Sequence, residues 1–307
     1  MNTTESSSHS LSEKEWKKKS VVHYNEVSQW TEPHRRRKAS RDKHPVYDFL
    51  FTYYPFALAK LEHWHPGYGA SIEIPKNEEV PAIYSTKFYK KNEKYISLTT
   101  QNLKEKEVDR MKWIHNLLTL TQNRPANFAC YGMHEWAMVY KTDHSNIDIR
   151  HRETAPLRFS KEETDRIVES RPICCTHFDA FRFFTPPALK FNKLQLTLED
   201  RANHEQPGCL HSNMDIYKWA SKCMPWVGSD LLWKCFKLAL KTRELDMKAS
   251  PYDLSQYGYP PVKIETPEGR EEYESTQRKI SEEAKPLRQQ IINISAKIIL
   301  HEENLLK

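Results

Sequence analysis

The chain has 307 residues, enough for one large domain or two small ones; 38% are hydrophobic and 11% aromatic, which predicts a core rich in aromatic rings. With only 7 glycines and neither a G-x-G-x-x-G nor a G-x-x-x-x-G-K-[ST] run, it lacks the loops that hold nucleotide phosphates in Rossmann and P-loop proteins. The net charge is +6, and no stretch approaches 18 uncharged apolar residues. We therefore expect a cytoplasmic protein without a membrane partner.

The six cysteines include no C-x-x-C pair, so the spacing argues against a zinc ribbon or a disulfide framework. Two of them, Cys174 and Cys175, are adjacent. We expect mostly buried thiols in a reducing compartment.

The first 30 residues are expected to form a flexible, charged segment and helix, with residues 1–10 frayed. Ser12 and Glu15 have the spacing of a capping box, which predicts that the helix begins there. Residues 31–307 are assigned to one mainly helical domain.

An aromatic helical run follows over residues 46–64, and Pro55 is expected to kink it. Residues 70–99, including 82–84, alternate in the manner of strands and predict a small antiparallel sheet. A helix with one apolar face is expected over residues 104–122.

Residues 125–141 are apolar on all sides, so helix and buried strand both remain open, with helix favoured because Pro125 suits a first turn. Residues 142–160 form a polar loop. The fold class is therefore α+β, mainly helical with a small antiparallel sheet near residues 70–99. Further helices are expected over residues 161–170, 176–184, 213–224, 228–247 and 268–306.

The segment from Tyr131 to Tyr140 places His134 and Glu135 inside an apolar run that also contains Trp136. Buried ionisable groups need partners, or their pKa values shift towards the neutral form. These two side chains are either satisfied structurally or used in chemistry.

A second segment, residues 176–184, has a similar character. On a helix, His177 shares a face with Phe181, and Asp179 can pair with Arg182 three residues later. A capped, salt-bridged core helix is the alternative to a functional site.

In a third segment, His211 and Asp215 are four residues apart and can face the same way. Ser212 or Asn213 is a natural N-cap, and the preceding Pro207-Gly208 leaves backbone N–H groups free for an anion. A rigid loop before a well-capped helix is the alternative.

In a fourth segment, Asp246 lies near a helix C-terminus, where a carboxylate opposes the helix dipole. Such a local conflict often marks a functional residue. Pairing with Arg243 or Lys248 is the alternative.

The N-terminal part also carries a basic arm that suits the phosphates of a nucleic acid backbone. A solvated face that keeps the protein soluble is the alternative. The arm consists of Arg35, Arg36, Arg37, Lys38, Arg41 and Lys43.

Ligand chemistry for a transition metal is present, although no H-E-x-x-H run occurs. We predict no cofactor. A metal, if bound, is expected on His134, His177, His211 and Asp215.

Five stretches together resemble a family of bacterial proteins, common in actinobacteria, that are usually named 3-methyladenine DNA glycosylase. Tyr131-Gly132-Met133 through Met138 is also similar to the Tyr-Gly-Met-x-x-x-x-Met strand that lines the base pocket of alkyladenine glycosylases. The resemblance covers about residues 30–290. The five stretches are residues 44–54, 134–140, 177–186, 206–220 and 243–254.

The resemblance implies an N-glycosylase that releases an alkylated base from DNA or a related nucleoside. Such an enzyme extracts the base, holds it against aromatic faces and activates water with a carboxylate. Glu135 and Asp179 are the expected carboxylates, with His134 and His177 beside them. The expected substrate-binding residues are Tyr131, Trp136, His211, Asp215, Asp246, Tyr252 and Asp253.

Two other functions remain open. One is a metal-dependent enzyme that acts on a small substrate through the His, Asp and Glu side chains. The other is a non-enzymatic nucleic-acid-binding protein that uses the basic arm.

Overall fold

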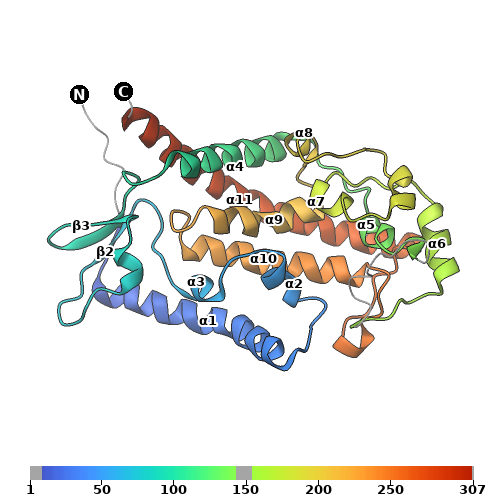
Figure 1. Ribbon diagram of the computed structural model, residues 1–307, viewed down its shortest axis with the longest axis horizontal. Helices are drawn as coiled ribbons and strands as arrows, with labels where there is room; N and C mark the ends of the chain where they lie inside the picture. Colours follow the sequence, from blue (N-terminus) through green and yellow to red (C-terminus); the bar gives the residue numbers. More distant parts are fainter. Residues whose placement is uncertain (1–8, 143–153, 306–307) are drawn as a thin grey trace.

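Five long helices run side by side across the molecule, with a small sheet at one end and short helices at the other (Figure 1). The computed structural model describes residues 9–142 and 154–305, and this part of the chain confirms the predicted, mainly helical α+β class. The long helices are α1 (Glu13–Ser40), α4 (Glu105–Asn123), α9 (Leu210–Lys222), α10 (Ser229–Lys248) and α11 (Pro267–Leu305).

The sheet has the strand order β1-β2-β4-β3. The antiparallel pairing predicted near residues 70–99 joins β2 to β4 and β4 to β3, whereas β1 adds a parallel edge strand. The sheet is therefore mixed, and His9, which we expected to be frayed, pairs with Ala70. The strands are β1 (His9–Leu11), β2 (Ala70–Glu73), β3 (Tyr89–Lys91) and β4 (Tyr95–Leu98).

Residues 82–84 were expected in a strand and instead belong to a 3-10 turn, Ala82–Ser85. The turn places Tyr84 against Trp16 of α1, with the ring centroids 5.7 Å apart, and the Tyr84 hydroxyl donates to the carbonyl of Trp64. Tertiary packing of one aromatic side chain thus overrides the local β preference.

The capping box at Ser12 and Glu15 is present, but α1 continues to Ser40, beyond the residue-30 limit that we expected. A buried stripe that includes Val27 and His34 keeps the helix packed past its internal proline.

Pro55 has the opposite effect in the run over residues 46–64. It does not kink one helix but separates two short ones, α2 (Asp48–Thr52) and α3 (Leu58–Glu62). A proline removes one backbone donor and clashes with the preceding turn, so a helix without a long buried stripe ends there.

In residues 125–141 the only helix is the five-residue α5 (Met133–Ala137). Tyr131 and Gly132 both have positive φ angles, of 49° and 74°. Two consecutive left-handed residues fit neither a helix nor a strand, so both expected continuous elements are wrong for this stretch.

Most helices expected in the second half of the chain are present. The helix expected over residues 176–184 is an exception, because it is reduced to four residues and His177 precedes it in an extended conformation. Helix α9 begins at Leu210, so Ser212 and Asn213 are not the N-cap but lie buried in its first turn. Of the polar loop expected over residues 142–160, residues 143–153 lie outside the described part. The short helices are α6 (Lys161–Glu169), α7 (Phe178–Phe181) and α8 (Arg201–His204), with 3-10 turns at Pro186–Phe191 and Ser255–Tyr257.

The main core lies between the long helices and is rich in aromatic rings, as the composition predicted. Trp136, Trp226 and Phe236 are among its fully buried side chains. A separate small core under the sheet contains Trp16 and Trp64. None of the described helices combines the length and the apolar character that a membrane crossing requires.

Candidate functional site

Ionisable side chains from four separate segments meet in one buried region, where α5 and α7 cover the ends of α9 and α10 (Figure 1). The sequence singled out each segment but did not place them together. The side chains are His134 and Glu135 of α5, His177 and Asp179 at the start of α7, His211 and Asp215 of α9, and Arg243 and Asp246 of α10, all of them buried.

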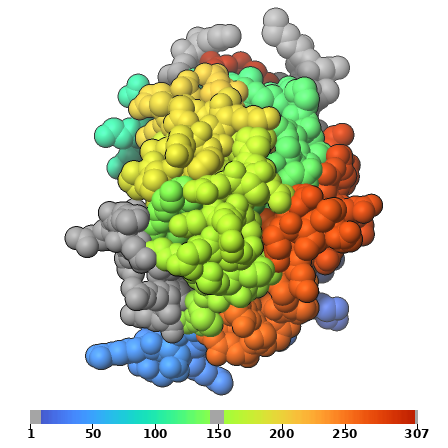
Figure 2. Space-filling view, turned by 90° about the vertical axis from the view of Figure 1, so that its right-hand side faces the viewer, coloured from blue at the N-terminus to red at the C-terminus, as the bar shows by residue number. Residues whose placement is uncertain are grey.

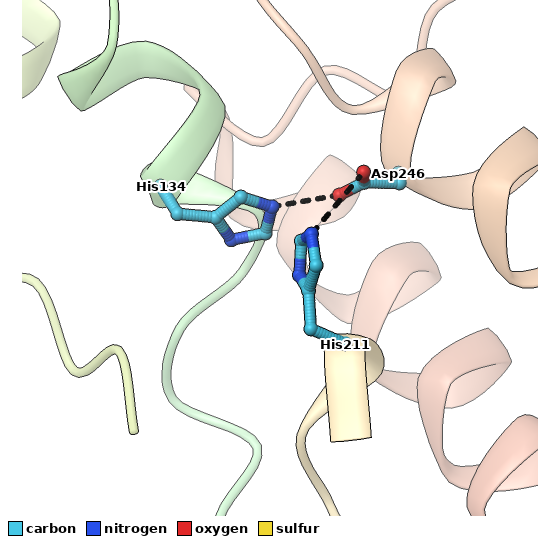
Figure 3. Close-up of side chains that lie close together, drawn as sticks. All are labelled: His134, His211 and Asp246. Atoms are coloured by element: carbon cyan, nitrogen blue, oxygen red, sulfur yellow. Dashed lines mark hydrogen bonds and ion pairs between the residues drawn. The ribbon is translucent and has the colours of Figure 1, made fainter. Parts of the chain in front are cut away.

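The first network consists of His134, His211 and Asp246 (Figure 3). The Nε2 atom of His134 lies 2.7 Å from Oδ1 of Asp246, and its Nδ1 atom lies 3.5 Å from the sulfur of Cys130. Burial favours the neutral ring, but the Asp246 carboxylate outweighs it and raises the pKa of His134 well above its usual value. The contact with Asp246 therefore favours the charged form of the His134 ring.

His211 approaches the same carboxylate without bonding to it. Its Nε2 atom lies 4.0 Å from Oδ2 of Asp246, and its ring meets His134 edge to face with the centroids 4.5 Å apart. Burial and the nearby His134 charge lower the pKa of His211 to about 3, so its ring is neutral. Within the described residues, the imidazole of His211 has no hydrogen-bond partner, although the residue is only 7% exposed.

Arg243 links this network to Glu135. Its Nη1 atom lies 2.7 Å from Oδ2 of Asp246 and 3.1 Å from Oε1 of Glu135. Burial and the Asp246 charge raise the pKa of Glu135, while Arg243 acts in the opposite direction. The guanidinium also packs on the ring of Phe49, 4.2 Å from its centroid.

The second network joins His177 to Asp215 of α9. His177 Nε2 lies 3.3 Å from Oδ2 of Asp215 and 3.4 Å from Oε1 of Glu205. The hydroxyl of Tyr54 donates to Asp215 at 2.8 Å. Burial opposes ionisation of Asp215, but Lys218 and His177 hold its pKa far below the usual range.

Cations already neutralise the carboxylates of this second network. The ammonium of Lys218 lies 2.9 Å from Oδ2 of Asp179 and 3.1 Å from Oδ2 of Asp215. Arg201 forms a further ion pair with Asp179, and the expected pair of Asp179 with Arg182 is present at 3.4 Å. The space between the two carboxylates is thus occupied by a side-chain cation.

Among residues 9–142 and 154–305, two groups of three side chains bring possible metal-ligand atoms within 4.8 Å of one another: His134, His211 and Asp246, and His177, Asp179 and Asp215. Only the first contains a neutral imidazole without a hydrogen bond, and Lys218 fills the second. The four ligands expected from the sequence are therefore divided between two networks, and Asp246, expected to bind substrate, joins His134 and His211.

Helix α9 connects the two networks. His211 and Asp215 lie one turn apart on it, and the rings of His177 and His211 are 5.4 Å apart between centroids. A change of charge in one network therefore acts on the other.

The remaining expected site residues lie elsewhere. Tyr131 donates to Glu274, and Trp136 donates to the carbonyl of Ala249 from a fully buried position. Tyr252 packs in a small separate core. The carboxylate of Asp253 accepts a hydrogen bond from the backbone of Ser255 in a turn.

The basic arm divides into two parts. Arg35 is paired with Glu32 and Glu62, and Arg37 with Asp48, so two of the six expected phosphate-binding cations form internal ion pairs. Lys38, Arg41 and Lys43 line an open pocket, and Arg36 is exposed on α1.

Several members of the networks were not anticipated as site residues. Cys130 precedes His134 by four residues, and Lys218 follows Asp215 by three residues on α9, so helical spacing signalled only the second pair. Arg201, the first residue of α8, and Glu205, which follows the helix, are also four residues apart. No local sequence pattern indicates the role of Tyr54, because its contact with Asp215 spans 161 residues.

The first network is nearly closed. Figure 2 shows the yellow-green and yellow segments after residue 154 covering much of this end of the molecule. The cavity beside His134 and His211 has a volume of about 10 Å³, roughly that of one water molecule. Four thiols line it, from Cys130, Cys174, Cys175 and Cys209.

Comparisons of the chain with protein-family models, with curated proteins and with solved structures find no match, so function has to be inferred from the residues of the site itself.

Proposed function

We propose that the protein is a metal-dependent hydrolase whose metal ion is bound by His134, His211 and Asp246. Two histidines and one carboxylate are a common ligand set of catalytic metal ions, because three protein ligands leave coordination positions for water and substrate. The observation that carries the proposal is the neutral, buried imidazole of His211, which faces the Asp246 carboxylate without a hydrogen bond.

That arrangement is unfavourable without a further partner. If the Nε2 lone pair faces Asp246, it meets a negative charge; if an N–H faces it, 4.0 Å is too long for a hydrogen bond. A cation held by His134, His211 and Asp246 would satisfy both groups, and His134 would bind it in its neutral form after its proton had passed to solvent.

A divalent ion held by His134, His211 and Asp246 would supply a water molecule that ionises near neutral pH. Arg243 holds Asp246 in place through the 2.7 Å contact and adds positive charge beside the centre. A positive charge in a buried site stabilises the negative charge that develops as water attacks. We assign Arg243 as a positioning residue.

Release of an alkylated base from DNA is a narrower form of hydrolysis and stays a prediction. The two carboxylates expected to activate water, Glu135 and Asp179, are engaged by Arg243 and by Lys218 with Arg201. This favours a metal-bound water over a free carboxylate as the activating group. Base release from alkylated duplex DNA, compared between wild type and Glu135→Gln, tests the narrower prediction.

Metal analysis of the full-length protein tests the proposal. The chelator-treated protein is dialysed against Zn²⁺, Mn²⁺ or Fe²⁺ and analysed for bound metal. We expect about one equivalent of one of these ions and a rise in Tm, because a ligand that binds only the folded state stabilises it.

His211→Ala and Asp246→Asn are expected to weaken metal binding by at least about tenfold, as loss of a ligand does. His177→Gln is the matched control, since it changes a buried histidine of the neighbouring network. Far-UV circular dichroism verifies folding. Less than about a tenth of an equivalent in wild type, or equal metal binding by folded His211→Ala and wild type, would refute the proposal.

A further inference from the structure

An open pocket with a volume of about 800 Å³ lies at the C-terminal end of α1 and over α2. Small-molecule sites usually measure about 300–1,000 Å³. Cations lie along its length and aromatic rings form part of its wall. These side chains are Lys38, Arg41 and Lys43, and Phe49, Phe51 and Tyr53.

The pocket carries excess positive charge. Two acids line it. Asp48 is neutralised by Arg37 at 2.6 Å and approached by His34 at 2.8 Å, and Asp42 accepts a hydrogen bond from Ser40. Lys38 and Arg41 are exposed and have no ion-pair partner among residues 9–142 and 154–305. They also outweigh the partial negative charge at the C-terminus of α1. An anionic group is therefore attracted to this opening.

A pair of stacked rings separates the pocket from the buried networks. Phe49 and Tyr53 lie nearly parallel, with centroids 4.7 Å apart and an interplanar angle of 12°. Arg243 packs against Phe49, and the Lys218 ammonium lies 6.0 Å from the Tyr53 centroid. One wall of the open pocket is thus in contact with both networks.

The electrostatics of Tyr53 agree with this placement. Burial and the charges of Asp215 and Asp179 raise the pKa of Tyr53 to about 12. Its phenol is therefore neutral, and the ring offers a flat surface on which another ring can stack.

We infer that this pocket binds a planar aromatic molecule that carries a phosphate or carboxylate group, seated beside the buried networks and separated from them by Phe49 and Tyr53. The ring packs against the aromatic wall and the anionic group lies near Lys38 and Arg41.

Fluorescence titration of the metal-free, full-length protein tests the inference. The probes are 4-methylumbelliferyl phosphate and coumarin-3-carboxylate, which carry both features, and 4-methylumbelliferone and inorganic phosphate, which carry one each; phosphate is followed by competition. We expect at least one aromatic anion to bind about tenfold or more tightly than either single-feature probe. The aromatic anion that binds identifies the charged group.

Lys38→Glu/Arg41→Glu is expected to weaken this binding by at least about tenfold. Lys18→Glu/Arg36→Glu makes the same charge change on α1 without touching the pocket, and its affinity is expected to stay within about twofold of wild type. Absence of aromatic-anion binding up to about 5 mM, or equal weakening by both variants, would overturn the inference.

The two proposals fail separately. Normal metal content with no aromatic-anion binding refutes the pocket alone. Aromatic-anion binding that depends on Lys38 and Arg41, in a protein that takes up no metal, refutes the metal centre alone.

Discussion

His65 is a half-buried histidine far along the chain from either network, next to the sheet. Its Nδ1 atom lies 2.7 Å from the Tyr89 hydroxyl, and Tyr84 packs edge-on to its ring. Burial lowers the pKa of His65 to about 4, with smaller effects from the charges of His63 and His23.

The low pKa of His65 makes stability depend on pH. Because the unfolded chain binds this proton near pH 6.5 and the folded chain only near pH 4, stability falls as the pH drops through this window. Between pH 7 and pH 5, His65 is expected to account for about 2 kcal/mol of the loss. Urea denaturation at pH 7 and at pH 5 should show that the free energy of unfolding decreases by about 2 kcal/mol less in His65→Gln than in wild type. An equal decrease in both proteins would contradict the assignment to His65.

At the scale of elements, a buried arginine ties α11 to α9 and α4. Arg288 is fully buried and donates to the side-chain oxygens of Asn213 at 2.5 Å and Gln122 at 2.8 Å. Neither partner is charged, and burial lowers the pKa of Arg288 to about 10. The guanidinium of Arg288 therefore relies on the amides of Asn213 and Gln122 for its side-chain hydrogen bonds.

Asn213→Ala is expected to destabilise the protein by about 2–4 kcal/mol, because it leaves a buried guanidinium with one partner fewer. Asn213→Leu/Arg288→Met removes both polar groups and should recover much of the loss. Chemical denaturation of wild type, Asn213→Leu, Arg288→Met and the double variant measures the coupling between the two side chains. Additive losses would show that the bond contributes little.

Elements with a strong local pattern were predictable from the sequence. Helix α4 and the antiparallel part of the sheet followed apolar periodicity, and the start of α1 followed its capping box. Residues 82–84 and 131–132 were not, since packing of Tyr84 and two left-handed residues decide their conformation.

The candidate site was predictable residue by residue but not as a geometry. His134 was singled out because it stands in an apolar run, and Asp246 because a carboxylate opposes the helix dipole. His211 was singled out because it lies four residues before Asp215. The His134–Asp246 contact spans 112 residues, and no local pattern encodes it. Helical spacing explains only contacts within one helix, such as Asp215 with Lys218.

At the scale of the whole molecule, the sheet and the candidate site lie at opposite ends of the long helices (Figure 1). Trp16 belongs to the small core under the sheet, where its indole N–H donates to the carbonyl of Glu73. This separation predicts that damage to the small core leaves the proposed metal centre intact.

Trp16→Ala is expected to reduce the free energy of unfolding by about 3–5 kcal/mol, as loss of a buried tryptophan does. Its metal content, measured where the variant is still folded, should equal that of wild type. A folded variant with less metal would show that the two ends are coupled.

The contact between His134 and His211 has a consequence for every titration of this protein. Because their rings lie 4.5 Å apart and both face the Asp246 carboxylate, the protons of this network are gained and lost together. A measured titration midpoint will therefore describe the linked groups of α5, α9 and α10 together and not a single side chain. Replacing one histidine will therefore redistribute protonation among those that remain.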